Sequence, residues 1–212
     1  MREAGFPSGG RRRPASRRPF LFDVETTGVP DDYSAPAEET SNWPRVVQVA
    51  WLFLDMDTER TLDAGNRIVR PEGFKIPRGA AEVHGITSEV ALREGEPIRD
   101  VLRRVGKPAS EATSFVAHNL QFDRGTLGAE FVRSEMRNVL AEARGVPGEC
   151  TMRETVSFCG LKQQKGGGAK FPKLGELHDR LFGREVEGAH DAAADVEALA
   201  RCYVKLKKEG VL

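Results

Sequence analysis

FLFDVETTG, at residues 20–28, begins as an apolar, aromatic run and then carries two carboxylates, Asp23 and Glu25. The run is typical of a buried strand, in which side chains two residues apart point to the same face of the sheet. Two unpaired anions at such a place repel one another and cost several kcal/mol unless a cation lies between them. The stretch therefore indicates either a divalent metal site or a strand end whose acids are exposed to solvent.

The composition is that of an ordinary globular chain, with 212 residues, 39% of them hydrophobic and 30% charged. This length suits one domain with a full core. Because no apolar run is long enough to cross a bilayer and none follows the charged N-terminus, we expect no membrane partner, no secretory signal and a cytoplasmic location. The three cysteines lie far apart, which favours reduced thiols and argues against a zinc site: they are Cys150, Cys159 and Cys202.

Residues 1–18 differ from the rest of the chain in charge. They hold six arginines and one glutamate, whereas the whole chain has a formal net charge of +0, so the remainder is acidic. The segment is rich in Gly, Pro, Ser and Arg and has little to bury, so we expect a disordered basic tail at 1–18 and one domain at 19–212. Such a tail either adds salt-sensitive affinity for a phosphate backbone or has no role.

Three strands are expected early in the chain. The 20–28 run is followed by a long, largely buried strand at 45–54, a polar turn at 55–60 and a third strand at 66–70. Three strands in succession suggest an antiparallel meander that feeds one sheet. Residues 29–44, between the first two strands, form a polar connection that is longer than a usual hairpin link, so it is either functional or mobile.

Helices alternate with a strand in the second half, which predicts an α/β sheet. We expect a short helix at 77–85, a capped turn at 86–89, a helix from 98 to 105, a strand at 113–117 and a helix from there to about 143. Two further helices are expected, one at 174–182 ended by Gly183 and one that starts near Asp191. A basic, glycine-rich loop at 162–173 either contacts a nucleic-acid backbone or is simply solvated.

Two further acids occupy places that are awkward for a charge. Asp123 lies at the mouth of the loop that leaves the 113–117 strand, and Asp195 lies at the edge of the core-facing side of the last helix. Taken alone, Asp123 suits the start of a helix and Asp195 suits a solvated flank. With Asp23 and Glu25, and with His190 just ahead of the last helix, they indicate one shared site.

Three segments, in order, resemble the exonuclease motifs of the DnaQ-like superfamily in its histidine-bearing DEDDh branch. They are FDVETTG at 22–28, HNLQFD at 118–123 and HDAAAD at 190–195, and VHGIT at 83–87 also resembles a family segment. The branch includes the epsilon subunit of bacterial DNA polymerase III, ribonuclease T and oligoribonuclease. The match in order and spacing covers nearly all of 19–208, and three motifs that each supply their acid make it highly specific.

The resemblance implies an α/β, ribonuclease H-like fold: a mixed sheet of about five strands, the first three antiparallel, with helices on its faces. It also implies 3′-to-5′ removal of nucleoside monophosphates from single-stranded DNA ends, with two Mg²⁺ or Mn²⁺ ions. By motif, Asp23 would bridge both ions, Glu25 and Asp195 would complete the site that holds the nucleophilic water, Asp123 would act on the second ion and His190 would be the general base.

The chemistry of these residue types agrees with that assignment. Two ions roughly 3.5 to 4 Å apart supply both a nucleophile and a counter-charge for the phosphate. Carboxylates and water suit hard ions such as Mg²⁺. Histidine titrates near neutrality, so it can accept the proton of the water at working pH.

The resemblance also assigns a set of substrate contacts: Val24, Thr26, Gly28, His84, Asn119 and Phe122. Gly28 would let backbone approach the terminal nucleotide, His84 would lie beside that nucleotide, and Asn119 would orient the loop of Asp123. The alternatives are structural roles for His84 and His118. For Phe122 the alternative to a wedge against a base is core packing.

Two features depart from the polymerase subunit. Residues 30–43 are longer than the short turn expected there, so we expect them to rim the site and restrict its substrates. Because the sequence stops soon after the last helix, we expect a stand-alone exonuclease and no segment that grips a polymerase partner. The remaining alternatives are an exonuclease of RNA or short oligonucleotides, a proofreading subunit of a DNA polymerase, and a non-catalytic nucleic-acid-binding module.

Overall fold

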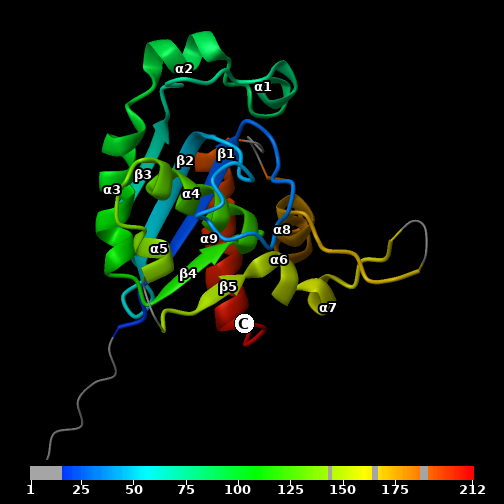
Figure 1. Ribbon diagram of the computed structural model, residues 1–212. Helices are drawn as coiled ribbons and strands as arrows, with labels where there is room; N and C mark the ends of the chain where they lie inside the picture. The colour runs from blue at the N-terminus through cyan, green and yellow to red at the C-terminus, as the bar shows by residue number, and fades with distance from the viewer. Residues whose placement is uncertain (1–15, 143–144, 164–166, 187–190) are drawn as a thin grey trace, which may run out of the picture.

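The computed structural model describes residues 16–142, 145–163, 167–186 and 191–212. Its centre is a five-stranded mixed sheet in the order β3-β2-β1-β4-β5 (Figure 1). The long strands β1 (Pro19–Thr26), β2 (Val46–Asp55) and β3 (Arg60–Ile68) form an antiparallel meander. The short strands β4 (Ser114–Ala117) and β5 (Gly148–Cys150) add to β1 in parallel. This confirms the predicted α/β, ribonuclease H-like architecture.

Helices cover both faces of the sheet. In chain order they are α1 (Arg78–His84), α2 (Ser88–Glu94), α3 (Ile98–Ser110), α4 (Leu120–Arg133), α5 (Val139–Glu142), α6 (Thr151–Glu154), α7 (Val156–Cys159), α8 (Leu174–Phe182) and α9 (Ala192–Lys208). Side chains of α3, α4 and α5 share one core with one face of β1 and β2. The long helix α9 packs on the opposite face and carries α8 on its outer side.

Side chains of β1 point alternately to the two faces of the sheet, so alternate residues contact different helices. Phe20, Phe22 and Val24 point into the core shared with α3 and α4. Leu21 points the other way, into the core shared with α9. Because strand side chains alternate, Asp23 and Glu25 follow Leu21 onto the α9 face.

Local signals in the sequence placed several helix ends correctly. Gly85 and Gly183 end α1 and α8 in the left-handed conformation, with φ of 76° and 67°, which glycine adopts without strain. The Thr87 hydroxyl caps α2 by accepting a hydrogen bond from the Val90 amide at 3.3 Å. Helix α9 starts directly after Asp191, close to the expected place, and the Asp191 side chain caps it.

Other expectations were wrong at their boundaries. The third strand begins at Arg60 and not near 66, because pairing with the full length of β2 recruits a stretch with exposed, unpatterned side chains. The helix expected to reach about 143 ends at Arg133, and Glu135 turns the chain with a positive φ of 51° before the separate helix α5. The fifth strand, β5, has only three residues and no β pattern, so the sequence did not locate it.

The expected tail at 1–18 falls mostly outside the described residues. Its last part, however, already joins the sheet, because the Arg17 carbonyl accepts a hydrogen bond from the Met56 amide at 2.9 Å and the Arg18 carbonyl accepts one from the Thr113 amide at 2.8 Å. No helix in the described part of the chain is long and apolar enough to cross a membrane.

Candidate metal centre

Three carboxylates meet where β1 passes beneath the first turns of α9. Asp23 and Glu25 come from β1, and Asp195 comes from α9, which packs across that face through Ala192, Val196 and other apolar side chains. One carboxylate oxygen from each of the three lies within 4.8 Å of the other two. Segments about 170 residues apart in the sequence therefore bring together an oxygen-rich site of the kind that binds divalent cations.

The pKa values record how unfavourable these charges are without a cation. Burial, followed by repulsion from Asp195 and Asp191, raises the pKa of Asp23 from 3.8 to about 7. Burial, followed by repulsion from Asp23, Asp195 and Asp191, raises the pKa of Glu25 from 4.5 to about 8. Each of these influences disfavours the ionised form, which is the form that a metal ion would stabilise.

Asp123 approaches the same strand from the opposite side, in the first turn of α4, and is 3% exposed. Strand β4 pairs with β1 only as far as Leu21. Beyond that point, the Val24 amide donates a hydrogen bond to the Asp123 carboxylate at 3.2 Å. Burial and the charge of Asp23 raise the pKa of Asp123 well above its ordinary value. Asp123 thus lies beside the three-carboxylate group and is electrostatically coupled to it through Asp23.

The start of α9 is held by a residue that the sequence analysis missed. Gln48, opposite Glu25 in the β1–β2 register, donates a hydrogen bond to Asp191 at 3.3 Å and accepts one from the Ala192 amide at 3.3 Å. Asp191 in turn accepts from the amides at 193 and 194, at 3.0 and 3.1 Å. The signal in the sequence was a lone polar residue within the apolar strand β2. His190, the expected base, lies outside the described residues.

The end of β1 forms a tight polar turn beside this group. The Thr26 hydroxyl donates to the Gly28 carbonyl at 2.6 Å, and Thr27 exchanges backbone and side-chain hydrogen bonds with Arg45. Gly28 has open space where a Cβ would lie. The turn is therefore held by hydrogen bonds and leaves open space at Gly28, while the expected substrate contacts of Val24, Thr26 and Gly28 stay a prediction.

His84 is buried and belongs to the same end of the sheet. Its Nδ1 accepts a hydrogen bond from the Ile86 amide at 3.1 Å, so the neutral ring carries its proton on Nε2. Burial lowers the pKa of His84, and the backbone of Thr26 partly opposes that shift. Nε2 is buried, and among the described residues no hydrogen bond of standard geometry reaches it. The contact with Ile86 is the structural role considered for His84, and it occupies Nδ1 only. The Nε2 hydrogen remains as a donor near the end of β1.

His118 is a structural histidine. Its Nε2 donates to the Pro172 carbonyl at 2.9 Å and its Nδ1 lies 2.9 Å from the Thr151 hydroxyl, so both nitrogens have partners. Burial lowers the pKa of His118 to about 4, which keeps it neutral at physiological pH. Asn119, next in the chain, takes a left-handed conformation with a φ of 106° and turns the chain into α4. His118 and Asn119 together set the start of α4, and so the position from which Asp123 reaches β1.

Residues 29–44, which we call the rim loop, are fastened to α4. The backbone carbonyls of Thr40 and Trp43 accept hydrogen bonds from Arg133, and the Trp43 indole donates to the Pro36 carbonyl at 3.0 Å. The Trp43 ring lies so close to Gly125 that a Cβ there would come within 2.1 Å of it. Asp32 and Asn42 close the loop on itself with two hydrogen bonds, of 2.8 and 2.9 Å. The rim loop is therefore held in place against α4, while the expectation that it rims the site and restricts its substrates stays a prediction.

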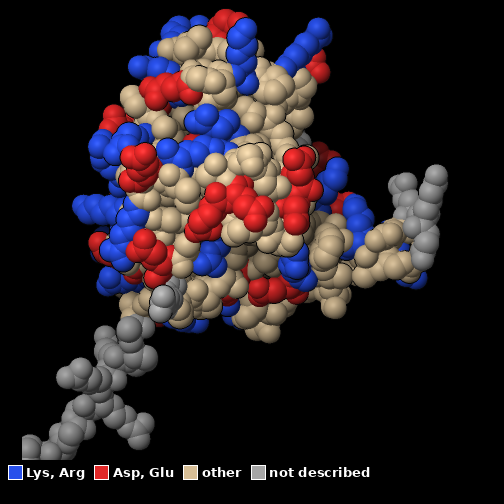
Figure 2. Space-filling model, viewed as in Figure 1, with Lys and Arg blue, Asp and Glu red and all other residues tan. Residues whose placement is uncertain are grey.

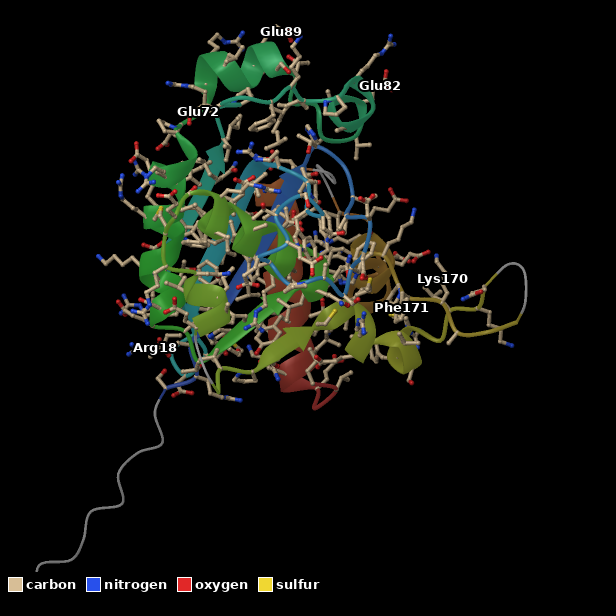
Figure 3. All side chains as sticks on the ribbon, viewed as in Figure 1. Arg18, Glu72, Glu82, Glu89, Lys170 and Phe171 are labelled. Atoms are coloured by element: carbon tan, nitrogen blue, oxygen red, sulfur yellow. The ribbon has the colours of Figure 1, made fainter. Side chains whose placement is uncertain are left out.

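The basic loop at 162–173 is only partly described. Lys170 and Phe171 lie on the segment between α7 and α8 (Figure 3). Lys170 pairs with Glu176 on α8 at 2.5 Å, so one of the lysines expected to face a phosphate backbone already has an acidic partner. Phe171 is 54% exposed. Contact of this loop with nucleic acid stays a prediction.

Comparisons with known proteins bear on the family and the fold. A family model described as Exonuclease (RNase_T) matches residues 20–203. A search of curated proteins finds no match. Among solved structures, the chain resembles Escherichia coli exonuclease I in complex with a dT13 oligonucleotide, with 20% identity and a TM-score of 0.70 over 90% of this chain and 41% of that one.

Two other structures of the same kind agree. A zinc-bound form of an E. coli exonuclease I complex with single-stranded DNA matches with 19% identity and a TM-score of 0.68, over 92% of this chain and 41% of that one. A product-bound exonuclease I matches with 18% identity and a TM-score of 0.70, over 91% and 44%. The chain thus spans about two fifths of the proteins it matches, and at this identity the likeness shows the fold. The family model matches most of the chain, so the chain belongs to the exonuclease family of the DnaQ-like superfamily.

Proposed function

We propose that this protein is a metal-dependent 3′-to-5′ exonuclease that releases nucleoside monophosphates from single-stranded DNA ends. The observation that carries the proposal is the convergence of Asp23, Glu25 and Asp195 within 4.8 Å of one another, on a chain that belongs to an exonuclease family. Hydrolysis of a phosphodiester needs a deprotonated water and a counter-charge, and neither is supplied by carboxylates alone.

The residues at the site fit divalent metal ions. Burial and mutual repulsion raise the pKa values of Asp23 and Glu25, so a cation at this place would relieve a cost already built into the fold. The donors are carboxylate oxygens, which suit Mg²⁺ or Mn²⁺. Asp23, Glu25 and Asp195 would hold one ion and Asp23 with Asp123 a second. When bound, such ions would lower the pKa of a water and neutralise the phosphate.

Side chains and backbone of the protein would bind the nucleotide, position the carboxylates and accept the proton. Turn atoms at Thr26 and Gly28 would receive the terminal nucleotide, because this backbone is ordered and Gly28 leaves its outer side open. Gln48 and Asp191 hold the first turn of α9 and so fix the position of Asp195. His190, which directly precedes Asp191, would accept the proton of the attacking water, as its place in the HDAAAD motif suggests.

A strand labelled at its 5′ end tests this function. With Mg²⁺ or Mn²⁺, the wild-type protein is expected to give a ladder that shortens from the 3′ end, and matched DNA and RNA strands decide the sugar preference. Asp23→Ala should abolish the ladder, and His190→Ala should slow it by about 10²- to 10⁴-fold. Leu62→Ala, at an exposed position on strand β3 that no step of the proposal uses, is the control and should retain activity. Undiminished activity in Asp23→Ala would overturn the assignment.

A further inference from the structure

Tyr33, on the rim loop, is an aromatic side chain that the proposed chemistry does not use. Its ring lies 6.2 Å from that of Phe122, centroid to centroid, and the residue is 42% exposed. Phe122 directly precedes Asp123, whose carboxylate binds the Val24 amide on β1. Phe122 packs against the core that β1 shares with α4, so the pair runs from that core, in the helix turn that carries Asp123, to the surface.

Tyr33 is held in this position by contacts of its backbone. The Gln121 side chain donates a hydrogen bond to the Tyr33 carbonyl at 2.7 Å, and Arg153 holds Gln121 with a hydrogen bond of the same length. The neighbouring Asp32 is locked by Asn42. An exposed ring on a fixed backbone loses little conformational freedom when a planar partner stacks on it.

Tyr33 also lines a cavity of about 680 Å³. The rim loop and α4 form two of its walls, and the segment from β5 to α6 forms a third. Tyr33, Gln121, Arg124 and Arg153 line it, among others. Its volume lies within the range of small-molecule sites, roughly 300 to 1,000 Å³, so it has room for a nucleoside.

The negative charge of the rim loop favours an uncharged base over a phosphate beside Tyr33. The loop exposes four acids and has no lysine or arginine between 29 and 44: they are Asp31, Asp32, Glu38 and Glu39. Acidic side chains gather over the middle of the face viewed in Figure 2, the region that this loop crosses in Figure 1. These charges repel a phosphate but not an uncharged base, and the two arginines of the cavity are already engaged, Arg124 with the Leu140 carbonyl and Arg153 with Gln121. A strand that passes here would therefore present its bases to Tyr33 and its phosphates to solvent.

We propose that Tyr33 stacks on a base of the single strand, close to the nucleotide being cleaved, and that the cavity beside it receives that base. The inference rests on the proposed function for the direction of the strand. It makes the rim loop a specificity element that requires unpaired bases near the 3′ end, because a base within a duplex has no free face for Tyr33.

Fluorescence of 2-aminopurine tests the stacking directly, with EDTA present so that no hydrolysis occurs. The base is placed second from the 3′ end of a DNA strand, in a matched RNA strand, and far upstream in a control strand. Wild-type protein and Tyr33→Phe should quench the near position, and Tyr33→Ala should not. Affinity for the strand should fall roughly 5- to 100-fold in Tyr33→Ala, in line with the loss of one base–aromatic stack.

Kinetics separate stacking from a merely structural role. For a single strand, Tyr33→Ala should raise KM and leave kcat nearly unchanged, while hydrolysis of the p-nitrophenyl ester of thymidine 5′-phosphate, which has no neighbouring base, stays at the wild-type rate. Leu62→Ala, at a β3 residue that is 46% exposed, is the matched control and should change neither. The salt dependence of binding should be the same in wild type and Tyr33→Ala, because no phosphate contact is lost.

Two results would overturn the inference: equal quenching in wild type and Tyr33→Ala, or an equal fall in the rates for the ester and the strand. Failure of the proposed function looks different. If wild-type protein hydrolyses neither substrate, the exonuclease assignment fails, while quenching at the near position still decides whether Tyr33 binds a base.

Discussion

Strand β1 separates two carboxylate sites that are built in opposite ways. On the α4 side, Glu130 is 1% exposed and lies between two guanidinium groups, with Arg45 at 2.7 Å and Arg133 at 2.9 Å. The Val46 amide donates to it as well, at 3.2 Å. On the α9 side, Asp23 and Glu25 lie against Asp195, and among the described residues neither Asp23 nor Glu25 takes part in an ion pair.

The two sites differ in how their buried negative charge is compensated. A buried acid that serves only the fold needs cations and hydrogen-bond donors, because its desolvation is otherwise uncompensated. Glu130 has these partners, and through Arg133 they also fasten the rim loop. The Asp23 group has further acids as neighbours instead, and its pKa values are raised as a result. Under the proposed function, a divalent cation supplies the positive charge that the chain itself does not place beside Asp23 and Glu25.

Glu130→Gln should give the largest change in stability. It leaves Arg45 and Arg133 without their counter-charge in a mostly buried place, so we expect a loss of about 3 kcal/mol in the free energy of unfolding. Urea denaturation followed by circular dichroism measures it. A loss below about 1 kcal/mol would mean that solvent already screens these groups as at an ordinary surface pair.

Asp23→Asn should have the opposite sign in metal-free protein. Removing one of three mutually repelling charges relieves a cost, so the free energy of unfolding at pH 8 should rise by about 1 to 2 kcal/mol while activity is lost. The same urea titration, with EDTA present, measures this. If the variant is less stable than wild type, the carboxylate group is not strained in the way that its raised pKa values indicate.

The smallest expected effect is a pH dependence of the stability that a bound metal ion adds to the protein. The folded-state pKa values of Asp23 and Glu25, about 7 and about 8, lie above their ordinary values of 3.8 and 4.5. The folded protein therefore binds more protons than the unfolded chain in this range, so the contribution of these groups to metal-free stability is full below about pH 4 and is lost as pH rises towards 8.

Because a divalent cation takes the place of those protons, Mg²⁺ should raise Tm more at pH 8 than at pH 6. Thermal melts at the two pH values, with and without Mg²⁺, measure the difference, and Asp23→Asn is the control that should remove it. An increase in Tm that is the same at both pH values would contradict the linkage.

The Asp23 side of this contrast could be predicted in part from the sequence, for local reasons, whereas the Glu130 site was not predicted. The alternation of β1 places Asp23 and Glu25 on one face, and Gly183 and Asp191 mark helix ends by their own chemistry. That Asp195 meets them was available only through the resemblance of three motifs, because no local rule says which helix crosses which strand.

What could not be predicted depends on contacts between distant segments. Gln48 matters because it reaches Asp191, 143 residues further along the chain. The rim loop is fixed because Trp43 fits against a glycine of α4, and β5 exists because β4 offers it an edge. In each case the decisive term is packing or pairing in the folded protein, which overrides weak local preference.

Equilibrium binding of Mn²⁺, followed by calorimetry, tests the central claim most directly. Wild-type protein and Glu130→Gln, at a urea-free condition where the variant is folded, should bind Mn²⁺ with similar affinity. Asp23→Asn should bind it more than about 10-fold more weakly, because it removes a direct carboxylate ligand. Equal binding by wild type and Asp23→Asn would contradict the account, since the three carboxylates would then not be where the metal is held.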